Sequence, residues 1–141
     1  FGPGMSFDNA YAIPSIMKKI EEAKIAKRNF IEVWGTGKPA RDFLYVKDAA
    51  QAILLSAEKY NSPEPVNIGS GKEVSIKDLI SILCRLMDFK GEIIWDNSKP
   101  DGQERRLIDI TKAKKEFGFS PKTTLEEGLL KTIQWYNTLK V

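Results

Sequence analysis

Hydrophobic residues recur at helical spacing in five stretches of the chain, with shorter extended runs between them. In the first stretch, Ile13, Ile16, Met17 and Ile20 fall on one face of a helix, and charged residues occupy the other faces. The predicted helices cover residues 12–26, 48–60, 76–87, 111–118 and 125–139. Short extended runs lie at 30–34, 42–46, 65–69, 92–95 and 107–110, and a long polar loop covers 96–106. Because helices and strands alternate, the pattern favours an α/β or α+β fold.

Residue types that cap helices mark the ends of several of these stretches. The predicted capping residues are Ser75 with Asp78, Thr124 with Glu127, and Thr111. A Ser or Thr followed three residues later by an acidic residue is typical of a helix N-terminus. Gly118 is predicted to end the helix that Thr111 opens.

Two predicted elements need a larger sheet than the short strands of this chain supply. The helix over 48–60 is apolar on nearly all sides, and such a helix needs burial on two sides. The run over 65–69 has the composition of a short buried strand. Both are therefore expected to pack against a sheet formed by residues outside the chain.

Composition and charge exclude several classes of protein. The 141 residues make one domain, with a net charge of +3 that is spread along the chain, which argues against a nucleic-acid module. The single cysteine, Cys84, makes no intrachain disulfide and indicates a reducing compartment such as the cytoplasm. Because the sequence has no histidine, a Ser-His-Asp triad, a Cys-His pair and a His-ligated zinc site are excluded, and we expect no metal. No run of ~20 apolar residues is present, so no membrane span is predicted.

The first residues, Phe1-Gly2-Pro3-Gly4, have the composition of a turn rather than of a signal peptide. The sequence does not begin with methionine. It is therefore expected to be part of a larger protein.

Polar and aromatic groups stand at four places where folding alone does not require them. Lys18 and Lys19 lie on the first helix, where they form either a solvated face or part of a binding site. Trp34 ends a strand before the turn Gly35-Thr36-Gly37, as a core aromatic or as a stacking platform. Each of these residues leaves a structural and a functional interpretation open.

The other two places are a loop–strand junction and the long polar loop. Arg41 suits bidentate binding of phosphate, although an ion pair with Asp42 or Asp48 is the alternative. The loop Ser98-Lys99-Pro100-Asp101-Gly102, which continues to Arg105-Arg106, is either functional or a flexible surface turn.

The order and spacing of these segments resemble a known family. The motifs that carry the resemblance are Phe1-Gly2-Pro3-Gly4, Ile13-Pro14, Val33-Trp34-Gly35-Thr36-Gly37, Arg41-Asp42-Phe43-Leu44-Tyr45-Val46, Val66-Asn67-Ile68-Gly69-Ser70-Gly71, Ser98-Lys99-Pro100-Asp101-Gly102, Leu125-Glu126-Glu127-Gly128-Leu129 and Trp135-Tyr136. The resemblance extends over essentially the whole chain. The sequence resembles the extended short-chain dehydrogenases that act on nucleotide sugars, and most closely their GDP-L-fucose synthase-like branch.

The resemblance implies an α/β fold in which residues 1–141 form the C-terminal substrate-binding domain. It also implies that some elements complete a Rossmann sheet supplied by a missing N-terminal half. That half would bind NADP or NAD, since this chain has neither a Gly-x-x-Gly-x-x-Gly turn nor a catalytic Tyr-x-x-x-Lys; Tyr136 and Lys140 match the letters only by coincidence. The intact protein is expected to be a homodimeric enzyme, and the chain alone to be inactive.

By position, the resemblance implies that Lys19, Trp34, Arg41, Asp101 and Arg106 bind the nucleotide sugar, with a GDP-sugar favoured. The three cations would neutralise the diphosphate, the indole would stack on the nucleotide, and the carboxylate would accept hydrogen bonds from sugar hydroxyls. No catalytic or cofactor-binding residue is assigned.

One position departs from the family pattern. Tyr11 stands where fucose synthases have the histidine that serves as the acid in epimerisation. A phenol ordinarily titrates near ~10 and is a poorer proton shuttle at neutral pH. Reduction of a 4-keto sugar, a single epimerisation and dehydration therefore all remain open, as does a stand-alone nucleotide-sugar-binding or interaction module without catalysis.

Overall fold

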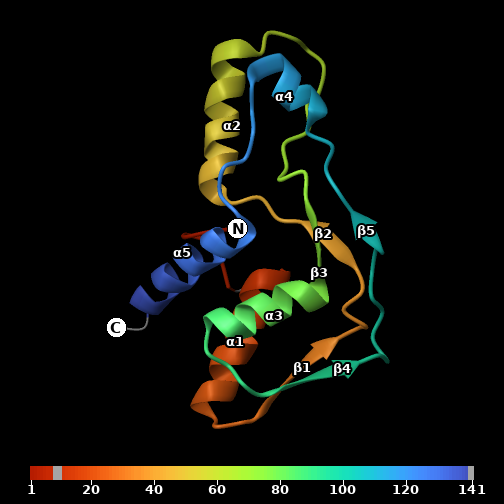
Figure 1. Cartoon of the computed structure of the whole chain (residues 1–141), viewed down its shortest axis with the longest axis vertical. Coiled ribbons are helices and arrows are strands. Elements are labelled where there is room, and N and C mark those ends of the chain that lie inside the picture. The colour runs from red at the N-terminus through yellow and green to blue at the C-terminus, as the bar shows by residue number, and fades with distance from the viewer. Residues whose placement is uncertain (8–10, 140–141) are drawn as a thin grey trace.

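The computed structural model describes residues 1–7 and 11–139 as an elongated molecule of helices and short strands (Figure 1). The helices are α1 (Ala12–Ile25), α2 (Val46–Lys59), α3 (Ile76–Leu86), α4 (Thr111–Phe117) and α5 (Leu125–Thr138). The strands are β1 (Phe30–Trp34), β2 (Ala40–Asp42), β3 (Glu73–Ser75), β4 (Glu92–Asp96) and β5 (Arg105–Arg106). This mixture confirms the predicted α/β class.

Two small sheets connect segments that are far apart in the sequence. Strands β1 and β4 pair in parallel, from Phe30 opposite Glu92 to Trp34 opposite Asp96. In the other sheet, β2 lies between β3, which is antiparallel to it, and β5, which is parallel to it. The connection from β4 to β5 runs along the edge of the molecule (Figure 1).

The main hydrophobic core lies where α1, α3 and α5 meet the β1–β4 sheet. Met17, Ile20, Leu79, Leu83 and Leu129 are fully buried there. These residues come from the apolar stripes that the sequence predicts, so the helical spacing correctly identifies the buried faces.

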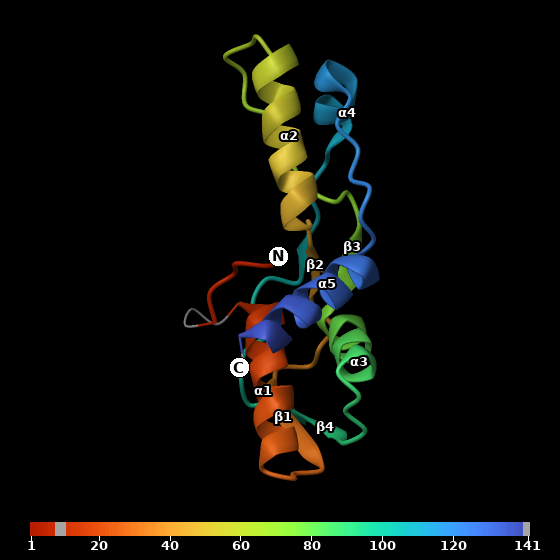
Figure 2. The ribbon, with the colours of Figure 1, turned by 90° about the vertical axis from the view of Figure 1, so that its left-hand side faces the viewer.

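A second, smaller core joins α2 to α4 at the opposite end of the molecule (Figure 2). It contains Ala52, Ala113, Phe117 and Phe119. Helix α2 buries little else, and Ile53 and Leu54 on the same helix are 62% and 59% exposed. The expected burial of this helix on two sides is therefore not met by the described residues.

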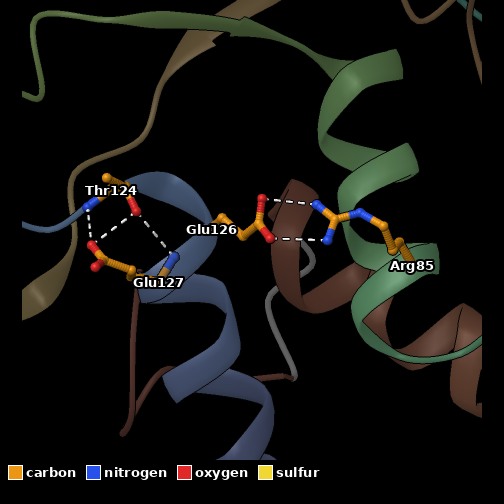
Figure 3. Close-up of polar contacts among 4 residues, drawn as sticks. All are labelled: Arg85, Thr124, Glu126 and Glu127. Carbon is orange, nitrogen blue, oxygen red and sulfur yellow. Dashed lines mark hydrogen bonds and ion pairs between the residues drawn. The ribbon is translucent and has the colours of Figure 1, made fainter.

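Most predicted caps are confirmed. The Thr124 hydroxyl accepts from the Glu127 N–H, and the Glu127 carboxylate accepts from the Thr124 N–H, which together make the predicted capping box (Figure 3). The Ser75 hydroxyl likewise accepts from the Asp78 N–H at 3.0 Å. Gly118 ends α4 with φ 72°, in the left-handed region that glycine favours.

One predicted cap is wrong. Thr111 is the first residue of α4 rather than its N-cap, which is Ile110. The Thr111 N–H donates to the Asp109 carboxylate at 2.9 Å. The aspartate two residues earlier therefore supplies the acceptor for an N–H group in the first turn of the helix.

Several extended predictions are also wrong. Residues 65–69 and 107–110 form no strand, and the run over 42–46 is a strand only at Asp42, after which α2 begins at Val46. A strand needs a neighbour for its backbone hydrogen bonds, and no described strand pairs with 65–69 or 107–110. Strands β3 and β5 were not predicted.

Candidate functional site

A pocket of about 490 Å³ lies between α1, the end of β1, β2 and the β4–β5 connection. Four of the five predicted binding residues line it: Lys19, Trp34, Arg41 and Asp101. They come from four separate segments of the chain, so only the fold brings them together. Its apolar wall includes Ile16, Val33 and Ile76.

Trp34 presents its ring to the pocket and to solvent. Its side chain is 64% exposed, so it is not a core aromatic. The Lys19 Nζ lies 6.0 Å from the ring centroid, and the Lys99 Nζ lies 5.6 Å from it. Two ammonium groups near one indole favour binding of an anion that also has a flat apolar part.

Lys19 differs from its neighbour Lys18, which is exposed. The half-buried Lys19 donates from Nζ to the backbone carbonyl of Glu32 at 2.7 Å. This bond holds the ammonium at the pocket wall, because Glu32 is on β1, next to the strand residues that line the pocket.

Arg41 and Arg106 lie side by side on neighbouring strands. They are paired in the parallel register of β2 and β5, and paired residues point to the same face of a sheet. Arg106 is exposed and does not line the pocket in this structure, but its register places it beside Arg41. The preceding residue, Arg105, points to the opposite face and binds the Glu73 carboxylate at 2.5 Å.

The alternative role of Arg41, an ion pair with a nearby aspartate, does not occur. The Asp42 carboxylate accepts from the N–H groups of Ser70 and Gly71 at 2.7 and 2.9 Å. The Asp48 carboxylate accepts from backbone N–H groups at 122 and 123. Arg41 donates from Nη1 to the carbonyl of Ala40, its own strand neighbour, which leaves its other guanidinium N–H groups available to a ligand.

Asp101 reaches the pocket as part of a contact with the glycine turn. The Thr36 N–H donates to one carboxylate oxygen and the Thr36 hydroxyl donates to the other, each at 2.6 Å. These two hydrogen bonds, with the hydroxyl contributing most and Lys38 nearby, lower the pKa of Asp101. Asp101 therefore stays ionised at neutral pH and has lone pairs left for a ligand.

A second pocket, also of about 490 Å³, adjoins the first through Ala12. It is lined mainly by apolar side chains, among them Phe1, Met5 and Phe43, together with Tyr11. Tyr11 is the N-cap residue of α1 and is 79% exposed. The two pockets form neighbouring sites along the start of α1.

Sequence reasoning assigned no role to Lys99 and Thr36, which contact the pocket residues Trp34 and Asp101. Both lie inside motifs that were singled out, but their roles depend on contacts between segments about sixty residues apart. Among the described residues, no group of three or more His, Cys, Asp or Glu side chains could hold a metal ion. No helix in residues 1–7 and 11–139 is long and apolar enough to cross a membrane.

Two solved structures that superpose on this chain are described as nucleotide-sugar enzymes. A GDP-L-fucose synthetase from Naegleria fowleri bound to NADP superposes with a TM-score of 0.92 at 29% identity, covering 99% of this chain and 44% of that one. The UDP-glucose 4-epimerase of Thermotoga maritima, solved with UDP-glucose, superposes at 0.85 with 27% identity, covering 100% and 44%. The chain therefore has the fold of part of an extended, Rossmann-type short-chain dehydrogenase.

Sequence relatives indicate which family within this class the chain belongs to. The chain is 40% identical over 138 residues to GDP-L-fucose synthase 1 of Arabidopsis thaliana, covering 96% of this chain and 42% of the relative. It is 41% identical to the GDP-L-fucose synthase of Sinorhizobium fredii, covering 95% and 43%. A family profile described as GDP-mannose 4,6 dehydratase matches residues 4–132, and the chain belongs to this family of enzymes. It spans about two-fifths of the length of these curated relatives.

Proposed function

We propose that the pocket between α1, β1, β2 and the β4–β5 connection binds the nucleoside diphosphate of a nucleotide sugar. The observation that carries this proposal is the convergence of Lys19, Trp34, Arg41 and Asp101 on one pocket. The intact protein would be an NADP- or NAD-dependent epimerase/reductase, for which residues 1–141 supply the substrate-binding domain.

Each group has a role that its surroundings support. Arg41 and its strand neighbour Arg106 bind the diphosphate, with Lys19 at the α1 side. The exposed Trp34 ring stacks on the base or ribose. Asp101 accepts from a hydroxyl group with the lone pairs that Thr36 leaves free.

The adjoining pocket is placed to receive the sugar. Its apolar lining suits the carbon face of a hexose, and Tyr11 stands at its edge. In this position the Tyr11 hydroxyl can donate a hydrogen bond to the sugar. The proposed reaction is therefore reduction or epimerisation of a GDP-linked sugar; the GDP moiety is supported by the GDP-L-fucose synthases among the relatives.

The chain itself does not fit the dinucleotide cofactor. A glycine-rich turn that could hold the pyrophosphate of NADP is absent from its sequence. The cofactor would be held by a Rossmann domain outside these residues, as the NADP complex of the Naegleria neighbour supports. We expect the 141-residue chain alone to lack activity, the intact enzyme to be a homodimer, and its compartment to be the cytoplasm.

Calorimetric titration of GDP into the protein expressed from its complete gene tests the proposal. Arg41→Ala should weaken GDP binding ten-fold or more, which is about 1.4 kcal/mol, while the affinity for NADPH stays within about two-fold. Arg105→Ala is the matched control, because Arg105 neighbours the site but binds Glu73 on the opposite face. Equal loss of GDP and NADPH affinity in Arg41→Ala, or no loss of either, would contradict the assignment.

A further inference from the structure

The connection between β4 and β5 forms one wall of the pocket although residues 97–104 contain no helix or strand. Its two ends are fixed. At the start, the Asp96 carboxylate accepts from both the N–H and the hydroxyl of Ser98. At the end, the Ala40 N–H donates to the carbonyl of Glu104 at 2.9 Å, which leads the chain into β5.

The middle of this connection is held by a contact that we name the Thr36–Asp101 clamp. Both carboxylate oxygens of Asp101 accept hydrogen bonds from Thr36, one from its N–H and one from its hydroxyl. The preceding residue, Gly35, has φ +81°, and a Cβ atom there would collide with the Asp101 carboxylate. The turn is thus shaped to receive this side chain, 65 residues further along the chain.

The clamp lies between groups that form the pocket. Two residues before Asp101, the Lys99 Nζ lies over the Trp34 ring. One residue after it, a Cβ at Gly102 would lie 3.9 Å from Nη2 of Arg41. The position of Asp101 therefore fixes how closely Lys99 approaches the indole and how closely the backbone approaches the guanidinium.

We propose that Thr36 is a positioning residue for nucleotide binding, which acts by clamping Asp101 and so holding Lys99 against Trp34 and Gly102 against Arg41. This inference rests on the proposed function of the pocket. Thr36 itself does not need to touch the ligand. The clamp holds the middle of the connection, so without it the pocket wall loses its fixed shape before the ligand arrives.

The test uses Thr36→Val, which removes the hydroxyl and keeps the shape, and Thr36→Ser, which keeps the hydroxyl. In the protein expressed from its complete gene, we expect Thr36→Val to raise the Kd for GDP about ten-fold and Thr36→Ser to stay within about two-fold of wild type. The thermal midpoint without ligand should stay within about 2 °C in both, because Thr36 is only half-buried. A residue with a merely structural role would lower the midpoint and leave the Kd unchanged.

A double-mutant cycle with Asp101→Asn identifies the partner. Both substitutions break the same contact. The Kd of the double variant for GDP should therefore equal that of the single variant with the larger loss of affinity. If Thr36→Val does not fold, Thr36→Ala, which also removes the hydroxyl, should show the same loss of affinity.

Three results would overturn the inference while leaving the proposed function intact. They are wild-type GDP affinity in Thr36→Val, equal weakening in Thr36→Ser, and losses that add in the double variant. A wild-type protein that binds neither GDP nor UDP would instead overturn the proposed function, so the two failures are distinguishable.

Discussion

Replacing Trp34 should separate base binding from phosphate binding, the two roles that we propose for the pocket. The ring is 64% exposed at the end of β1, so Trp34→Ala should change the free energy of unfolding by less than about 0.5 kcal/mol. Stacking of a base on an aromatic ring contributes about 1–3 kcal/mol. The Kd for GDP should therefore rise about 5- to 150-fold, while Trp34→Phe, which keeps a flat face, should lose less.

Comparing the affinity for GDP with the affinity for inorganic pyrophosphate isolates the stacking role of Trp34. Inorganic pyrophosphate has the charge of a diphosphate but nothing to stack, so its affinity should be unchanged in Trp34→Ala and reduced in Arg41→Ala. Calorimetric titration of both ligands gives the comparison, and Ile94→Ala is the control, because Ile94 is an exposed apolar residue on the neighbouring strand β4. If Trp34→Ala weakened pyrophosphate as much as GDP, the stacking role would be refuted.

Two further predictions concern stability. The Glu126 carboxylate accepts two hydrogen bonds from the Arg85 guanidinium at 2.9 and 2.8 Å (Figure 3), and these lower the pKa of Glu126. A lowered pKa gives stability that is present above the unfolded-state pKa and is lost as pH falls through the folded-state value. Urea unfolding should thus show Glu126→Gln less stable than wild type at pH 7, with the difference shrinking as the pH falls below the ordinary range of a glutamate pKa, whereas Glu116→Gln, at an exposed position, should match wild type throughout. Leu79→Ala, in the main core with no exposed surface, should cost about 2–5 kcal/mol in the same assay; a smaller loss would show that the site collapses around the cavity.

The sequence predicted the helices better than it predicted which strands form and pair. The five helices begin and end within two residues of the predicted bounds, because apolar stripes and capping residues lie within the helices themselves. Strands β1 and β4 were also predicted, β1 with its observed bounds and β4 one residue short at its end.

The errors lie where structure depends on distant partners. Strand β5 consists of two arginines and forms only because Arg106 pairs with Arg41, 65 positions earlier. The 65–69 run has the composition of a strand but no described partner strand. The pocket shows the same division: Trp34 and Arg41 were identified as binding residues from their motifs, whereas the role of Thr36 depends on its contact with Asp101, which the motif alone does not reveal.

The two ends of the molecule differ: one contains the pocket, and the other exposes an apolar helix face. The nucleotide pocket draws on α1, β1, β2 and the β4–β5 connection, which pack on the main core or pair with its strands. At the other end, α2 exposes Ile53 and Leu54, and the nearby 65–69 run lacks a neighbouring strand. Exposed apolar side chains on a helix that is apolar on most sides favour contact with a further sheet. Because α2 and the β1–β4 end of the pocket lie at opposite ends of the molecule (Figure 1), we propose that this chain binds the nucleotide and that the cofactor is held by a separate domain, which contacts α2.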